Sequence, residues 1–273
     1  MAELTALPVT TSRLSASGVS LGYDDRRVIE DLTFALPDGE ITAIVGANGC
    51  GKSTLLRGLT RLLKPTSGSV VLDGRDIHAM SGKEVARTVA LLPQSPLAPE
   101  GITVTELVSR GRHPYHGMFK QWSAADERAV TEALEVTGTI EMADRAVAQL
   151  SGGQRQRVWI AMVLAQQTDL LLLDEPTSAL DIAHAVDVLD LVTELNRDRG
   201  TTVAMVLHDL NLAARYATHL VAVHRGSIVA SGAPADVVNP EVVKQVFGIA
   251  AHVIADPVSG TPLIIPIGRH HRG

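Results

Sequence analysis

Aromatic residues are scarce in this chain: they make up 3% of its 273 residues, whereas hydrophobic residues make up 45%. The core must therefore be aliphatic, built mainly from Leu, Val, Ile and Ala. The charged fraction of 20% is ordinary for a globular protein and excludes a largely disordered one. The length fits one large α/β domain or two smaller ones, and such a chain can bury a full core without a disulfide or metal staple.

Cysteine, basic charge and long apolar runs are also lacking. Cys50 is the only cysteine, so no internal disulfide can form and a reducing, cytosolic setting is expected. A formal net charge of -6 argues against a nucleic-acid partner and against polybasic attachment to anionic lipid. No apolar run approaches the roughly 18 residues of a spanning helix, and the N-terminus does not resemble a secretory signal. The chain is expected to be soluble, or held at a membrane only by a partner.

Short apolar runs bounded by turn residues predict the strands of an α/β core. Such runs occupy residues 32–36, 41–45, 70–72, 170–173 and 201–207. The first of them alternates apolar and polar residues, and the turn at Asp73-Gly74 indicates a hairpin. The sequence therefore predicts a mostly parallel sheet with an antiparallel β part near its start.

Helical patterns fill the spaces between these strands. Helices are predicted over residues 52–63, ended by Pro65, and over residues 179–199, closed by Gly200. Helices also dominate residues 96–165, where Ser123 and Asp126 resemble a capping box. We therefore expect a helical lobe inserted in the α/β core.

The strongest local motif is a glycine-rich run between a predicted strand and a predicted helix. It reads Gly46-Ala47-Asn48-Gly49-Cys50-Gly51-Lys52-Ser53, followed by Thr54. The run fits G-x-x-x-x-G-K-[ST], in which backbone N–H groups and a helix N-terminus face a phosphate. Lys52 is expected to reach the β- and γ-phosphates of a nucleotide, and Ser53 to hold Mg²⁺. A glycine-rich turn without function is the alternative, and the flanking strand and helix favour the phosphate loop.

Two carboxylates, Asp174 and Glu175, end the apolar strand at 170–173. Ligands of open parallel sheets bind at the carboxyl ends of the strands. Asp174 is therefore expected to hold Mg²⁺ through water, and Glu175 to polarise an attacking water. Alone, such a pair is more often a solvated acidic turn; together with the phosphate loop it predicts a nucleotide hydrolase.

A third motif, Leu150-Ser151-Gly152-Gly153-Gln154, precedes a predicted helix and offers a second anion site. Phosphate loop, LSGGQ and LLLLDE occur in the order found in the ATP-binding subunits of ABC transporters, which this chain resembles. The resemblance covers residues 14–268 and implies the P-loop NTPase fold of ABC ATPases. It leaves short tails at 1–13 and 269–273.

The resemblance also implies roles for four single residues. Gln94 would contact Mg²⁺ and the transmembrane partner, and Asp181 would end the D-loop Ser178-Ala179-Leu180-Asp181. His208 would contact the γ-phosphate, and Tyr23 would stack on adenine. Taken singly, His208 would usually be only a polar residue at a loop, Tyr23 fits sheet packing equally well, and Gln94 carries almost no information. Only their joint order assigns them.

In the resembling family, the signature motif of one subunit faces the phosphate loop of another. Each ATP, with Mg²⁺, would lie between Lys52 of one copy and Ser151 and Gly153 of a second, so a homodimer is expected. The resemblance further implies a separate transmembrane permease and, indirectly, an extracytoplasmic substrate-binding protein. The subunit would then sit peripherally at the cytoplasmic face of the membrane.

Residues 110–126 and 246–266 resemble the iron–siderophore branch of these importers, which also contains haem and cobalamin importers. A soluble ABC ATPase is the alternative, although the chain lacks long coiled-coil insertions and a second ATPase unit. His113 and His116 could suggest a metal site, but a contact with the membrane subunit is favoured. His270 and His271 are expected to belong to the terminal tail.

Cys50 allows two interpretations. It can be a small residue that fills space inside the phosphate loop. Alternatively, the adjacent Lys52 and the helix N-terminus can favour a reactive thiolate that bound nucleotide would shield.

Overall fold

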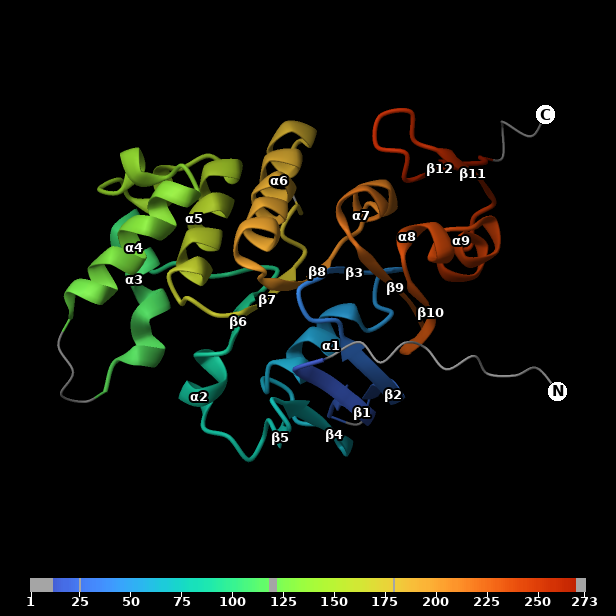
Figure 1. Cartoon of the computed structure of the whole chain (residues 1–273), viewed down its shortest axis with the longest axis horizontal. Coiled ribbons are helices and arrows are strands. Elements are labelled where there is room, and N and C mark those ends of the chain that lie inside the picture. The colour runs from blue at the N-terminus through green and yellow to red at the C-terminus, as the bar shows by residue number, and fades with distance from the viewer. Residues whose placement is uncertain (1–11, 25, 118–121, 179, 269–273) are drawn as a thin grey trace.

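The fold is that of a computed structural model, which describes residues 12–24, 26–117, 122–178 and 180–268 (Figure 1). Most of the two expected terminal tails lies outside these residues, as do Ala179, His270 and His271.

A six-stranded sheet forms the centre of the molecule, in the order β10-β9-β3-β8-β7-β6. Its strands are β3 (Ile41–Gly46), β6 (Val89–Leu92), β7 (Leu170–Asp174), β8 (Thr202–Val206), β9 (His219–His224) and β10 (Ser227–Gly232). All neighbours pair in parallel except β10, which runs antiparallel to β9. Strands β3, β7 and β8 are buried along their whole length and mostly apolar because helices or a second sheet cover both faces. The predicted strands at 41–45, 170–173 and 201–207 are confirmed to within one residue at each end.

An antiparallel sheet precedes and covers this one, in the order β2-β1-β4-β5. Its strands are β1 (Leu14–Tyr23), β2 (Arg26–Leu36), β4 (Ser67–Leu72) and β5 (Arg75–Asp76). The predicted antiparallel part near the start of the chain is thereby confirmed, including the hairpin that turns at Asp73-Gly74.

Helices fill the remaining layers (Figure 1). They are α1 (Lys52–Leu59), α2 (Gly82–Ala86), α3 (Val104–Ser109), α4 (Ala124–Val136), α5 (Gly152–Leu164), α6 (Ile182–Arg199), α7 (Leu210–Tyr216), α8 (Pro234–Val237) and α9 (Pro240–Phe247). Helices α3, α4 and α5 form the lobe at the left of Figure 1, and a hairpin of β11 (Ala251–Ala255) and β12 (Pro262–Pro266) lies beyond α9 at the right. The capping box predicted at Ser123 and Asp126 starts α4.

Two predicted helix boundaries are wrong. Helix α1 ends at Leu59 instead of continuing to residue 63, because Arg61 adopts a left-handed φ of 65°. Helix α6 begins at Ile182 instead of residue 179, because Asp181 caps it and accepts the backbone N–H of His184 at 2.9 Å.

The core has two parts, one on each face of the central sheet. Alternate strand residues such as Ile44 and Leu172 face the antiparallel sheet and α1. Their neighbours, such as Val45 and Leu173, face the helical lobe and α6. The carboxyl ends of β3, β6, β7 and β8 therefore meet at one edge, held rigidly from both sides.

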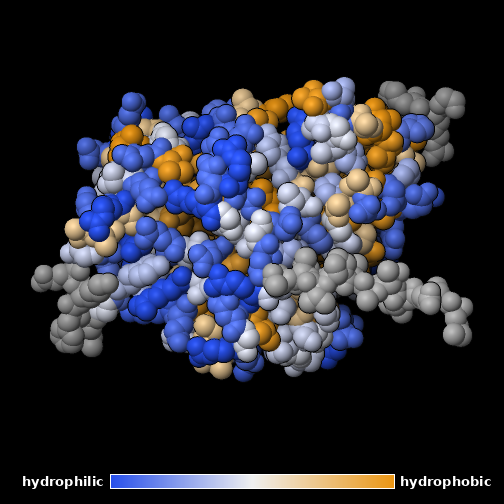
Figure 2. Space-filling view, in the orientation of Figure 1, coloured by the Kyte–Doolittle hydropathy of each residue, from blue (hydrophilic) through white to orange (hydrophobic). Residues whose placement is uncertain are grey.

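Hydrophilic residues dominate the face shown in Figure 2, and hydrophobic residues gather mainly over the C-terminal hairpin. The exposed apolar residues of that region are Ile249, Ile254, Val258 and Ile265. Among the described residues, no helix combines the length and the apolar character that a membrane crossing requires.

Candidate functional site

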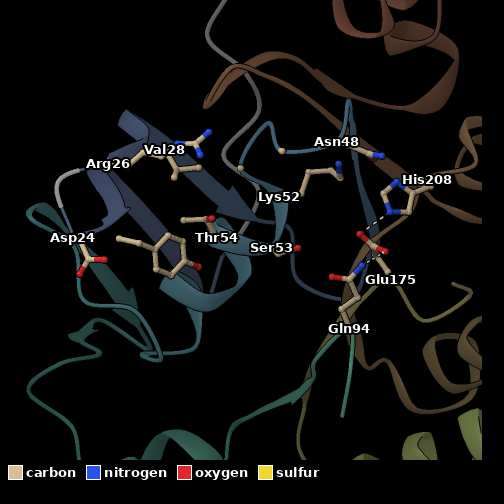
Figure 3. Close-up of a pocket in the computed structure, with 13 residues that line it drawn as sticks. Asp24, Arg26, Val28, Asn48, Lys52, Ser53, Thr54, Gln94, Glu175 and His208 are labelled. Carbon is tan, nitrogen blue, oxygen red and sulfur yellow. Dashed lines mark hydrogen bonds and ion pairs between the residues drawn. The ribbon is translucent and has the colours of Figure 1, made fainter. Parts of the chain in front are cut away.

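A pocket of about 930 Å³ opens at the carboxyl edge of the central sheet (Figure 3). Six residues of the glycine-rich run and the helix after it line the pocket: Asn48, Gly49, Gly51, Lys52, Ser53 and Thr54. Gln94 after β6, Glu175 after β7 and His208 after β8 line it from the other side, and Tyr23 closes its far end. The sheet topology thus gathers residues that are as much as 185 positions apart, from Tyr23 to His208.

Backbone geometry explains the glycines of the loop. Gly51 has a φ of 112° and Gly49 a φ of 74°, conformations that other residues rarely adopt. Gly46 lies so close to β9 that a Cβ atom there would come within 2.3 Å of the carbonyl oxygen of Val223. The loop can therefore curl tightly against the sheet only with glycine at these positions.

Lys52 is held inside the curl of the loop. Its Nζ donates hydrogen bonds to the carbonyl oxygens of Gly46 at 2.9 Å and Ala47 at 3.0 Å. The residue is 5% exposed. Gly46 and Ala47 thus act as backbone acceptors for Lys52 and do not line the pocket.

A hydroxyl and a carboxylate meet beside the loop. The Oγ of Ser53 donates to Oδ1 of Asp174 at 2.8 Å, which joins the start of α1 to the end of β7. Burial raises the pKa of the Asp174 carboxyl above its usual range, and the Ser53 hydroxyl opposes that shift. A buried carboxylate beside a hydroxyl is a donor set that suits Mg²⁺, because hard cations prefer oxygen ligands.

Glu175 lies between Gln94 and His208, which approach its carboxylate from opposite sides (Figure 3). Gln94 Nε2 donates to Oε2 of Glu175 at 2.5 Å, and His208 Nε2 lies 2.6 Å from Oε1. Glu175 is 9% exposed, whereas the His208 side chain is 43% exposed. The three residues form one polar unit at the mouth of the pocket.

Around Tyr23, at the opposite end of the pocket, lie residues that the sequence did not single out: Arg57, which lines the neighbouring pocket, and three that line this one. The Tyr23 hydroxyl accepts from Arg57 Nη1 at 3.1 Å, and the Arg57 guanidinium lies 6.0 Å from the ring centroid. Asp24, Arg26 and Val28, at the β1–β2 turn, also line this end. A basic residue four positions after Ser53, on the same face of a helix, is the signal that could have indicated Arg57.

The LSGGQ residues lie on a separate surface. Ser151 caps α5, and Gln154 completes the capping box by accepting the backbone N–H of Ser151 at 3.1 Å. Ser151 and Gly152 are exposed, and Gly153 is buried. Neither these residues nor Asp181 lines the pocket around Lys52. One chain therefore does not bring the phosphate loop and the LSGGQ motif together.

Known proteins share this combination of sequence and fold. The family model described as "ABC transporter" matches residues 29–178. The chain belongs to the ABC transporter family. The ferric enterobactin transport ATP-binding protein FepC of Escherichia coli (strain K12) is 54% identical, over 95% of this chain and 96% of its own length. The probable siderophore transport system ATP-binding protein YusV of Bacillus subtilis (strain 168) is 55% identical, over 94% of each chain.

Solved structures give the same result for the fold. One chain from a transporter described as of the metal-chelate type, in an inward-facing conformation, superposes with a TM-score of 0.82 and 27% identity. That likeness covers 95% of this chain and 99% of the other. The predicted P-loop NTPase fold of an ABC ATPase is confirmed, and the chain is an ATP-binding hydrolase of this family.

Cys50 of this ABC ATPase is packed inward. It is 7% exposed and belongs to the apolar cluster between the two sheets, with Sγ 4.0 Å from Lys52 Nζ. A Cβ on Gly46 would lie 2.7 Å from that sulfur. The structure therefore favours a small, space-filling residue over an accessible thiol, and Cys50 does not line the pocket.

A second pocket of the ABC ATPase, about 770 Å³ in volume, lies in the helical lobe. His113, His116 and Trp122 line it, and the two aromatic rings of His116 and Trp122 meet edge to face at 5.6 Å. His116 Nε2 is 3.2 Å from Asp126 Oδ2 but lacks the alignment of a hydrogen bond. Among the described residues, no group of three or more His, Cys, Asp and Glu side chains is arranged as a metal site.

Proposed function

We propose that this chain is the ATP-hydrolysing subunit that powers an importer of iron–siderophore complexes, and that it works as a homodimer on a separate membrane permease. The observation that carries the hydrolytic part is the position of Glu175, held between Gln94 and His208 at the mouth of the phosphate-loop pocket.

Different residues of the pocket would bind different parts of ATP. Tyr23, 40% exposed at the far end, offers its ring to adenine. The loop from Gly46 to Ser53 and the start of α1 offer backbone N–H groups to the phosphates. Lys52 would exchange its bonds to Gly46 and Ala47 for the β- and γ-phosphates, which stabilises the negative charge that develops there.

Magnesium fits the oxygen donors beside the loop. Ser53 and Asp174 would hold the ion, Asp174 through water, and Gln94 is the third candidate ligand. When bound, Mg²⁺ neutralises charge on the β- and γ-phosphates. The Ser53–Asp174 contact of 2.8 Å already fixes the two oxygen donors beside each other.

Glu175 is the residue proposed to orient and deprotonate the attacking water. Both of its carboxylate oxygens are occupied, one by Gln94 and one by His208. A water that binds Glu175 either uses a remaining acceptor site of these oxygens or replaces one of the two contacts. In the second case His208, the more exposed partner, would be released to contact the γ-phosphate, and Gln94 would move toward the metal. This coupling makes hydrolysis depend on the positions of two loops.

The signature motif completes the site of the second subunit. Ser151, Gly152, Gly153 and Gln154 form the start of α5, and the positive N-terminal end of this helix suits a phosphate, although the capping box already engages the backbone N–H groups of Ser151 and Gln154. Asp181 would contact the same partner subunit. Charge stabilisation from both sides suits the loose transition state of phosphoryl transfer.

The siderophore assignment is supported by relatives more than half identical over nearly the whole chain, whose names refer to ferric enterobactin and siderophore transport. The pocket of the helical lobe, with His113, His116 and Trp122, is proposed as the contact with the permease. A substrate-binding protein outside the membrane would deliver the complex, and this subunit would bind peripherally at the cytoplasmic face. Haem and cobalamin are the alternative cargoes.

Substitution of Glu175 tests the hydrolytic part. Glu175→Gln should keep ATP binding and lower the hydrolysis rate by about two orders of magnitude or more, because the amide cannot accept the proton of water. ATP should then trap a dimer, detectable by size-exclusion chromatography. Unchanged phosphate release by the assembled transporter would remove Glu175 from this role.

Uptake measurements test the cargo. A strain that lacks this subunit should lose uptake of labelled ferric siderophore and regain it with the wild-type chain but not with Glu175→Gln. Haem and cobalamin uptake, measured in parallel, should not change. Loss of cobalamin or haem uptake in place of siderophore uptake would reassign the cargo and leave the ATPase role intact.

A further inference from the structure

The ring of His184, in the first turn of α6, lies directly against a glycine of the signature motif. A Cβ atom built on Gly153 would lie 2.2 Å from Cδ2 of His184 and 2.9 Å from its Nε2. Since real Cβ atoms do not approach other atoms this closely, any residue larger than glycine here must displace the ring from this position. Figure 1 shows α5 and α6, which carry these two residues, as neighbouring helices.

Asp181 fixes the orientation of this ring. Its Oδ1 accepts both the backbone N–H of His184 at 2.9 Å and the ring Nδ1–H at 2.8 Å. The same contacts hold the pKa of the Asp181 carboxyl below its usual range, the backbone N–H of His184 contributing most. With Nδ1 engaged as a donor, the opposite edge of the imidazole faces Gly153. One side chain therefore contacts both the D-loop and the signature motif.

We propose that His184 is a positioning residue that holds Asp181 and the signature motif together, so that both meet the nucleotide site of the partner subunit as one unit. This inference rests on the proposed two-chain ATP site. Asp181 and His184 have side chains 67% and 43% exposed, and Ser151 beside them is exposed as well. Two loops from different helices are thus fixed to each other before a partner arrives, which lowers the entropy lost on association.

His184 should affect association and the local packing against Gly153, but not the nucleotide pocket of its own chain. His184 does not line the pocket around Lys52, so ATP binding by the isolated chain should not depend on it. If His184 merely stabilised α6, its substitution would lower the melting temperature but would not weaken dimerisation at unchanged ATP affinity.

Two variants remove one contact each. His184→Asn keeps an N–H donor near the place of Nδ1 for Asp181 but loses the ring edge over Gly153. His184→Phe keeps a ring over Gly153 but cannot donate to Asp181. His252→Asn, at an exposed histidine of β11, is the matched control.

The variants are combined with Glu175→Gln, and ATP-dependent dimerisation is measured by analytical ultracentrifugation alongside ATP affinity of the monomer. Both variants should weaken dimerisation by about tenfold, a typical coupling between neighbouring groups, at unchanged ATP affinity. The His252 control should dimerise normally. If all variants dimerise equally, the proposed role of His184 is overturned, whereas the proposed two-chain site is not. Failure of Glu175→Gln itself to dimerise would overturn the proposed two-chain site and the role of His184 with it.

Thermal stability tests the contact independently of any partner. Gly153→Ala should lower the melting temperature by about 2–4 °C in the wild-type background, because the new methyl group displaces the ring from Asp181. In a His184→Ala background the same substitution should not lower it, since alanine is the better helix residue. A decrease of equal size in both backgrounds would show that the ring does not constrain Gly153.

Discussion

Glu175 has a backbone φ of 55°, a left-handed conformation that a non-glycine residue adopts at a cost of order 1–3 kcal/mol. The residue directly follows the buried strand β7. This turn directs the carboxylate toward Gln94 and His208 instead of continuing the strand. Strain at a residue held by two polar neighbours fits a role in which its orientation, and not only its charge, must be fixed.

The burial of Cys50 predicts how its thiol reacts. Because it is 7% exposed and packed between the sheets, burial should limit its reaction with a maleimide. Labelling of the native chain should be slow and equally slow with and without MgATP, whereas the unfolded chain should label fully. Mass spectrometry measures the extent of labelling. Cys50→Ala should retain ATP hydrolysis.

Fast labelling that MgATP suppresses would restore the interpretation of Cys50 as an exposed, reactive thiol. Fast labelling that MgATP does not change would instead indicate local opening of the loop.

Single residues differ in how far the sequence predicts them. The motif around Lys52 predicts its own local geometry, because glycines, lysine and helix are contiguous. Gln94 and His208 carry no signal of their own, and only the topology of β6, β7 and β8 brings them to Glu175. Arg57 and His184 each have a local signal, the spacing from Ser53 and from Asp181, but their contacts with Tyr23 and Gly153 join residues distant in the chain, which no local pattern reveals.

At the scale of elements, the sequence predicts a helix boundary correctly where the signal for that boundary is local and unambiguous. The box at Ser123 predicts the start of α4 because its hydrogen bonds are local. The end of α1 depends on Arg61 in a left-handed conformation, a position where glycine is the usual signal. The start of α6 was placed too early because its cap, Asp181, follows other residues of good helix propensity.

Helix α4 is joined to the signature helix by a buried ion pair. Asp126 accepts from the Ser123 hydroxyl at 2.6 Å and from Arg112 Nε at 2.9 Å. Arg112 also donates to the carbonyl oxygen of Ala165, just after α5, at 2.8 Å. These hydrogen bonds, the one from Ser123 first, hold the pKa of the Asp126 carboxyl well below its usual range despite its burial.

This ion pair makes stability depend on pH with a definite sign. A carboxyl with a depressed folded-state pKa stabilises the fold fully above its unfolded pKa of about 4, and this contribution is lost as pH falls from there toward the folded-state pKa. Asp126→Asn should therefore lower the melting temperature at pH 7, and the difference from wild type should shrink between pH 4 and pH 2. Differential scanning calorimetry measures it.

Asp144→Asn, at an exposed carboxylate of the same lobe, is the control and should show little difference at any pH. A difference for Asp126→Asn that stays constant down to pH 2 would mean that the charge of Asp126 does not contribute to stability.

At the scale of the whole molecule, the phosphate-loop pocket and the signature motif lie on two separate surfaces. The central sheet and the antiparallel sheet hold the phosphate-loop pocket, whereas α5 and α6 hold the signature motif and Asp181. The order of motifs predicts that both exist, but their separation within one chain depends on how the helical lobe packs on the sheet. In the proposed arrangement, the two half-sites on one chain each need a second chain to complete them.

Mixed dimers test this arrangement. Lys52→Ala removes the cation of the phosphate loop but leaves the signature motif intact, and Ser151→Arg does the reverse. Each variant alone should be inactive, because every site in its dimer is damaged. In a one-to-one mixture, half of the dimers contain one copy of each variant, and one of their two sites joins an intact loop to an intact signature. Phosphate release should then recover to about a quarter of the wild-type rate, since half of the dimers carry one intact site of two.

A mixture of Lys52→Ala with Glu175→Gln is the matched control and should not recover, because both damage the same half-site. Equal inactivity of both mixtures, with both variants folded by melting temperature, would contradict the proposal that each site joins the loop of one chain to the signature of the other.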